Sequence, residues 1–92
     1  MLYVIIGFDG PHGKDKRPVH RPAHLERLEI LDKQGKLILA GPLTDGTGSL
    51  IVIEASTLIE AEQFAHSDPY FTNGIFERVS VHPFKQVLPS PA

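Results

Sequence analysis

Four apolar runs divide this chain of 92 residues. The first three are almost uninterrupted, which indicates strands covered on both faces rather than strands with one face in water. We predict these strands over Leu2–Phe8, Lys36–Leu43 and Leu50–Ala55. A fourth strand is expected over Ile75–Val87, with two valines on one face and a mixed set on the other: Val79 and Val81 against Phe76, Arg78, Ser80 and His82.

Two stretches between the strands have helical spacing instead. After Pro22, which suits a first helical turn, apolar residues recur at Leu25, Leu28 and Leu31 until Gly35, so a helix is predicted over Pro22–Gln34. The second helix begins after Thr57, which forms a possible capping box with Glu60. Its apolar face is formed by Leu58, Ala61, Phe64 and Ala65, and it is expected to end at Asp68-Pro69, because a residue before proline avoids the helical region.

Polar segments connect these elements. His12–His20 is basic and is predicted to be a loop, and Thr44–Ser49 holds two glycines, as is typical of a hairpin. The predicted domain is 1–88, followed by a flexible tail at 89–92.

The order β-α-β-β-α-β predicts an α+β, ferredoxin-like fold: a four-stranded antiparallel sheet with two helices on one face. The other face would then be uncovered, although the strands are apolar on both sides. We therefore expect a homodimer through the open sheet face.

Composition limits the possible function. The net charge of −2 and 22% charged residues give no field that attracts nucleic acid or a membrane. The absence of cysteine excludes disulfides, thiolate metal sites and a thiol nucleophile. The N-terminus lacks the pattern of a secretory signal, and no apolar run approaches the ~20 residues of a membrane span, so a cytoplasmic protein is expected.

One pair of residues stands out chemically. Asp68 closes the second predicted helix, where the macrodipole disfavours a carboxylate by roughly 0.3–1 kcal/mol, so a partner is expected. His24 lies on the apolar stripe of the first helix, four residues before Leu28, and should point inward. In the predicted topology the start of the first helix and the end of the second share one edge of the sheet. A carboxylate on one ring nitrogen would leave the other free to take or give a proton.

Other residues at this edge are candidates for binding a substrate. Tyr70 follows the bend, Gly41 and Pro42 leave backbone room, and Arg21 with Arg17 could hold an anion. Structural roles remain open for all of them: packing for Tyr70, strand termination for Gly41-Pro42, surface charge for the arginines. His24 could equally be a satisfied histidine, and Asp68 a turn former.

Metal and nucleic-acid sites are not expected. His12, His20, His66 and His82 lack metal-binding spacing, so neither a metal nor another cofactor is predicted. The third strand lacks the stacking aromatic residues with which ferredoxin-like sheets bind RNA.

Four segments in this order resemble the YciI-like (YCII-related) family: Arg21-Pro22-Ala23-His24-Leu25, Ala40-Gly41-Pro42-Leu43, Ser67-Asp68-Pro69-Tyr70 and Val79-Ser80-Val81-His82-Pro83-Phe84. The resemblance covers nearly the whole chain. It implies a dimeric α+β barrel and a His-Asp pair that corresponds to His24 and Asp68. One branch of the family eliminates chloride from a chlorinated hydroquinone.

Two functions are therefore considered. The first is a cofactor-independent lyase or isomerase that uses His24 and Asp68 as an acid/base dyad on a small, cyclic or aromatic molecule. The alternative is a non-catalytic ligand-binding or accessory dimer, in which the same pair only ties the first helix to the turn after the second.

Overall fold

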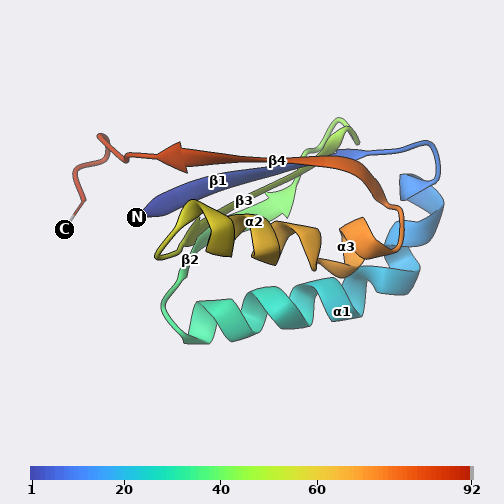
Figure 1. The fold of residues 1–92 in the computed structure, drawn as a ribbon. Coiled ribbons are helices and arrows are strands. Elements are labelled where there is room, and N and C mark those ends of the chain that lie inside the picture. Colours follow the sequence, from blue (N-terminus) through green and yellow to red (C-terminus); the bar gives the residue numbers. More distant parts are fainter. Residues whose placement is uncertain (92) are drawn as a thin grey trace.

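The computed structural model describes residues 1–91, in which three helices accompany four strands. The elements are, in order, β1 (Leu2–Asp9), α1 (Gly13–Lys33), β2 (Leu37–Pro42), β3 (Gly48–Glu54), α2 (Leu58–His66), α3 (Pro69–Thr72) and β4 (Phe76–Phe84). The strands form one antiparallel sheet in the order β2-β3-β1-β4, and Figure 1 shows the helices on one side of it. This is the predicted ferredoxin-like α+β fold.

The core lies between this sheet and the helices. Tyr3 and Ile5 of β1 alternate with outward residues and pair with Ile53 and Ile51 of β3, so the four side chains lie on the helix side. Leu28 of α1, two alanines of α2, Ala61 and Ala65, and Ala55 after β3 complete the cluster. Side chains alternate between the two faces of each strand and repeat with the helical period on α1 and α2. Each element can therefore turn one apolar face to the core.

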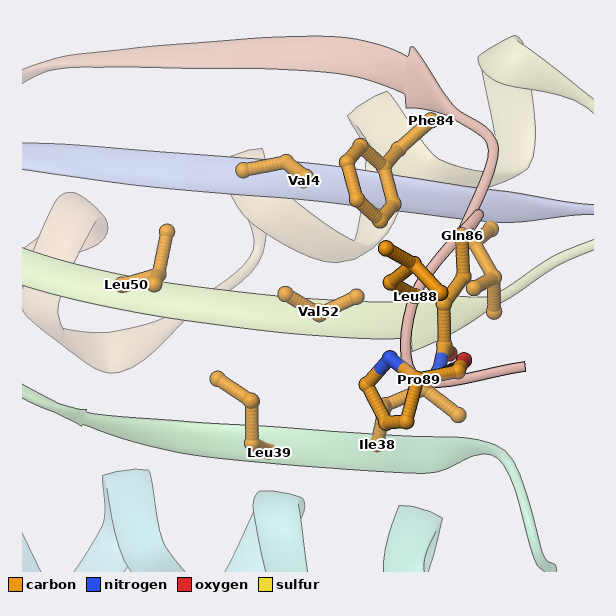
Figure 2. Close-up of a pocket in the computed structure, with 10 residues that line it drawn as sticks. Val4, Ile38, Leu39, Leu50, Val52, Phe84, Gln86, Leu88 and Pro89 are labelled. Carbon is orange, nitrogen blue, oxygen red and sulfur yellow. Dashed lines mark hydrogen bonds between the residues drawn. The ribbon is translucent and has the colours of Figure 1, made fainter. Parts of the chain in front are cut away.

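The opposite face of the sheet carries no helix and is also apolar. Leu39 of β2 and Phe84 of β4 are 51% and 43% exposed there. Figure 2 shows Val4, Leu50 and Val52 between them, with Leu88 and Pro89 of the C-terminal segment lying over the sheet. These residues line a hollow of about 500 Å³ together with Leu2, Ile38, Leu39, Phe84 and Gln86. We call this surface the open sheet face.

The prediction of a loop over His12–His20 is wrong, because α1 already begins at Gly13. This first part has no apolar periodicity; it is held by tertiary contacts instead. Arg17 pairs with Asp9 at the end of β1, and the ammonium group of Lys16 donates to the backbone carbonyl of Asn73. Pro18 and Pro22 lie inside the helix, and Figure 1 shows its N-terminal part turning away from the rest, as expected where prolines interrupt the hydrogen-bond ladder.

The stretch after α2 also differs from the prediction. Helix α2 ends at His66 with Ser67 as its C-cap, and the chain then forms a third, short helix, α3, that was not predicted. Asp68 is the N-cap of α3, where its carboxylate accepts the backbone N–H of Tyr70 at 2.8 Å. A carboxylate is favoured at such a helix start, so its position is explained locally as well as by a partner.

Phe76 was predicted on the face of Arg78 and Ser80, and this too is wrong. The pairing of β1 with β4 shifts at Phe8/Asp9, so that Phe8 faces Arg78 and Asp9 faces Phe76. The extra residue turns the Phe76 ring into the core beside Tyr70 and Ile75. Val79 and Val81 pack against the helix-side core, as predicted.

The remaining element boundaries lie close to the predicted ones, except at the end of β4. Gly35, with φ +72°, follows the end of α1, and β4 is shorter than predicted because it ends at Phe84. Residues 85–91 form neither helix nor strand; the last position of the predicted tail, residue 92, lies outside the described residues. Within 1–91, none of the helices has both the length and the hydropathy that crossing a membrane requires.

Candidate active site

The structure brings His24 and Asp68 together, although forty-four positions separate them. Nδ1 of His24 lies 2.8 Å from Oδ1 and 2.9 Å from Oδ2 of Asp68. Both residues are buried, with exposed fractions of 6% and 3%. Because an ionised carboxylate only accepts, Nδ1 carries the hydrogen and donates it, which leaves the lone pair of the neutral ring on Nε2.

Tyr70 contacts both His24 and Asp68. Its ring stacks on the imidazole of His24, with centroids 3.9 Å apart and planes inclined by 2°. The Phe76 ring in turn contacts the Tyr70 ring edge-on, with centroids 5.5 Å apart. The tyrosine supplies a backbone donor to Asp68 and a flat surface to His24, so its position constrains both members of the dyad.

Arg17 lies against the same tyrosine ring. Its Cζ is 5.1 Å from the Tyr70 centroid, and its Nε and Nη2 each donate to one carboxylate oxygen of Asp9 at 2.8 Å. Nη2 also donates to Oγ of Ser49 at 3.1 Å. The hydrogen bonds to Asp9 raise the pKa of Arg17 above its usual value, and burial opposes them. The charge of Asp9 and the nearby Tyr70 phenol act in the same direction as those hydrogen bonds.

Arg27, one turn after His24 on α1, ties the helix to the chain just before Asp68. Its Nη2 donates to the carbonyl of Phe64 and to Oγ of Ser67, and its guanidinium lies 4.4 Å from the Phe64 ring centroid. Burial lowers the pKa of Arg27, and the negative charge of Asp68 opposes that effect. This contact holds the end of α2 at α1.

A cavity of about 370 Å³ opens beside the dyad, between α1 and the β2 edge of the sheet. We call it the dyad cavity. It includes His24 and all four residues predicted to bind a substrate, Tyr70, Arg21, Gly41 and Pro42; its other lining residues are Arg17, Leu25, Leu28, Ala40 and Ser49. Asp68 itself lies behind His24 and does not line it.

Sequence reasoning missed two of these polar groups. Asp9 was regarded only as the end of a strand, and Ser49 only as part of a hairpin. A signal for Ser49 existed, since it stands two residues before inward-facing Ile51 in a strand and therefore shares its face. Among residues 1–91, no group of three or more His, Cys, Asp or Glu side chains is placed to hold a metal ion.

The fold and the dyad cavity define a small α+β protein with a buried histidine–aspartate pair beside a ligand-sized cavity. The chain belongs to the YCII-related domain family, whose model matches residues 1–85. Protein YciI of Escherichia coli O6:H1 is 41% identical, with 96% of this chain and 100% of that protein aligned. An uncharacterized protein of Haemophilus influenzae is 36% identical over the same shares.

A solved structure with this fold carries a named activity. It is the 5-chloro-2-hydroxyhydroquinone dehydrochlorinase TftG from Burkholderia phenoliruptrix, in complex with 2,5-dihydroxybenzoquinone. It is 30% identical to this chain with a TM-score of 0.83, and the match covers 95% of this chain and 96% of TftG.

Proposed function

We propose that this protein is an enzyme that transfers a proton on a small, cyclic or aromatic molecule, in a reaction of the lyase or isomerase type. The observation that carries the proposal is the buried His24–Asp68 pair, whose hydrogen bond leaves Nε2 as the ring atom available to a substrate. Proton transfer of this kind needs one positioned titratable side chain and no cofactor.

In the proposed mechanism, Nε2 of His24 takes a proton from a C–H or O–H group of the bound molecule. The electron pair of that bond forms a new double bond, and either a leaving group departs with its own electron pair or the proton returns at another atom. Asp68 keeps the ring in the required tautomer and stabilises the imidazolium that forms. The Tyr70 ring holds the imidazole plane during the transfer.

The comparison with TftG supports the reaction class. A dehydrochlorination removes a proton and a chloride ion, which is an elimination with the same requirements. The similarity supports a small cyclic substrate, whereas the choice of substrate depends on side chains around the cavity that can differ at 30% identity.

The first test is a ligand screen. Phenolic, quinone and lactone compounds are screened by thermal shift, because a ligand that binds the folded protein raises its melting temperature. Each compound that binds is then incubated with the enzyme in D2O, and NMR follows deuterium incorporation, elimination or isomerisation.

The dyad variants decide the assignment. We expect His24→Gln and Asp68→Asn to remain folded and to bind the same compound, with turnover reduced by roughly 10²–10⁴-fold for the histidine variant. Turnover that survives in His24→Gln would contradict the proposed base.

One observation favours the alternative, a ligand-binding or accessory protein. The dyad also joins α1 to the start of α3, so the same hydrogen bonds have a structural use. In that case, His24→Gln would lower the melting temperature, while no bound compound would be converted by the unsubstituted protein.

We also propose that the molecule is a homodimer through the open sheet face. Its support is the row of apolar side chains that the helices leave uncovered, which includes half-exposed Leu39 and Phe84. A second copy of the same face would cover it with two-fold symmetry.

A further inference from the structure

We propose that the dyad cavity contains an anion-binding subsite at Nη1 of Arg17, and that the substrate is a small planar molecule with an ionised oxygen, a phenolate or a carboxylate. The inference rests on the proposed function, since it names the class of substrate for that cavity.

The guanidinium of Arg17 has more hydrogen-bond donors than Asp9 and Ser49 use. A guanidinium has five N–H groups in a fixed plane. In Arg17 three of them are used: the one on Nε and one on Nη2 bind Asp9, and the second on Nη2 binds Ser49. The two N–H groups of Nη1 remain for the neighbouring Tyr70 hydroxyl, which also raises the pKa of Arg17 through a hydrogen bond, and for a ligand, in a side chain that lines the dyad cavity.

The side chains of Arg17 and His24 both form part of the cavity wall. The side chain of Arg17 is 14% exposed. Among residues 1–91, Nη1 of Arg27 is the buried side-chain nitrogen or oxygen that lacks a hydrogen-bond partner. Nη1 of Arg17 and Nε2 of His24 are not among such atoms, and both side chains line the cavity. The Tyr70 ring contacts both side chains: the imidazole of His24 stacks on it at 3.9 Å, and Cζ of Arg17 lies 5.1 Å from its centroid.

The wall of the dyad cavity is positively charged. Arg17 and Arg21 both line the cavity, and none of its lining residues is a carboxylate. Asp9 balances one of the two positive charges from behind. An anion that enters the cavity therefore meets a net positive charge in a partly desolvated place, where charge-assisted hydrogen bonds are strongest.

The volume and the apolar walls of the dyad cavity suit a small ring. The other walls are apolar, formed by Leu25, Leu28, Ala40 and Pro42, and a volume of about 370 Å³ suits a ligand of one ring. When His24 removes a proton, negative charge grows on the conjugated oxygen of such a ring. Arg17, fixed in advance by Asp9 and Ser49, would stabilise that charge without reorganising.

The test compares charged and neutral probes of one shape by isothermal titration calorimetry. Benzoate and benzamide are titrated into the protein, together with 2,5-dihydroxybenzoquinone as an ionisable hydroxylated ring. We expect benzoate to bind at least about tenfold more tightly than benzamide, and Arg17→Met to abolish that preference, while His24→Gln retains it.

Two further variants control for folding and for charge. Asp9→Asn combined with Arg17→Met removes both partners of the ion pair, so no carboxylate is left unpaired, and the preference should again be lost. Lys36→Met removes an exposed positive charge that does not line the cavity and should change the preference by less than about threefold.

Equal binding of benzoate and benzamide, a preference that survives Arg17→Met, or no binding of benzoate and the quinone at about 10 mM would each overturn the subsite. These outcomes are distinct from failure of the proposed function. If the preference depends on Arg17 but the protein converts none of its ligands, the subsite stands and the proposed enzymatic function fails. If the protein converts a ligand but shows no preference that depends on Arg17, the proposed function stands and the subsite fails.

Discussion

The carboxylate of Asp68 has two roles, as the partner of His24 and as the N-cap of α3. Oδ1 accepts from both Nδ1 of His24 and the backbone N–H of Tyr70, while Oδ2 accepts from Nδ1. The sequence indicated a carboxylate at the unfavourable end of a helix that needed a counter-group. The counter-group is present, but the local reason is different, because the aspartate begins the next helix.

Two substitutions of Asp68 separate these purposes. Asp68→Ala removes the N-cap and leaves Nδ1 of a buried histidine without a partner, so we expect the free energy of unfolding to fall by about 1–3 kcal/mol. Asp68→Asn keeps an oxygen that can accept both bonds and should lose less than about 1 kcal/mol, because Asn is an equally good N-cap. Urea unfolding measures both; an alanine variant as stable as the asparagine variant would contradict the cap.

Gly7 is required by close packing. A Cβ built at Gly7 would lie 2.5 Å from the ring of Phe76, whereas one at Gly41 would meet nothing within 4 Å. We therefore expect Gly7→Ala to destabilise the protein by about 1–3 kcal/mol through overpacking, and Gly41→Ala to have little effect. Thermal and urea unfolding of the two variants provide the comparison, and equal stabilities would show that the Phe76 ring can move aside.

Elements differed in how far the sequence could predict them. Strands β1 and β3 and the second half of α1 were predicted because their apolar pattern is their main source of stability. The first half of α1 was missed because its residues are polar and it is held by side-chain contacts, with Asp9 of the preceding strand and with Asn73, that leave no apolar periodicity. Helix α3 is four residues long, too short for any periodicity.

The same reasoning applies to the site. The proximity of His24 and Asp68 could be predicted because one lies on an apolar stripe and the other precedes a proline. The predicted topology places the start of the first helix and the end of the second at the same edge of the sheet. The contacts of Arg17 with Ser49 and Tyr70 could not be predicted, since they depend on the helical start of α1 and on a strand register that no local pattern contains.

Helix α2 allows a clean test of capping. Oγ1 of Thr57 accepts the backbone N–H of Glu60 at 3.1 Å, which is half of the predicted capping box. We expect Thr57→Ala to lower the free energy of unfolding by about 1 kcal/mol, and Thr57→Ser to retain most of it because the hydroxyl remains. Denaturant titrations of the two variants measure the difference; the same loss in both would assign it to the methyl group instead.

At the scale of the whole molecule, the two proposed surfaces lie on opposite sides of the sheet. The dyad cavity is bounded by α1, by the end of β2 and by Ser49 of β3, whereas the open sheet face lies on the side of the sheet that carries Val4, Leu50 and Val52. Dimerisation would therefore leave the cavity accessible.

A charged substitution tests the dimer. We expect the unsubstituted protein to be a dimer at micromolar concentration and Leu39→Glu to be a monomer, because the introduced charge would have to be buried between two sheets. Ile59→Glu is the matched control, since Ile59 is 68% exposed on α2, away from that face, and should leave the dimer intact. Size-exclusion chromatography with light scattering measures the mass; a monomeric unsubstituted protein would contradict the proposal.

Tyr70 has one more consequence. Its ring touches the imidazole while its own amide hydrogen is bound to the carboxylate, so a single backbone signal is coupled to both partners of the dyad. The chemical shift and hydrogen-exchange rate of that amide can therefore report occupancy of the cavity before any substrate is known. The residue that orders the site is also its built-in spectroscopic probe.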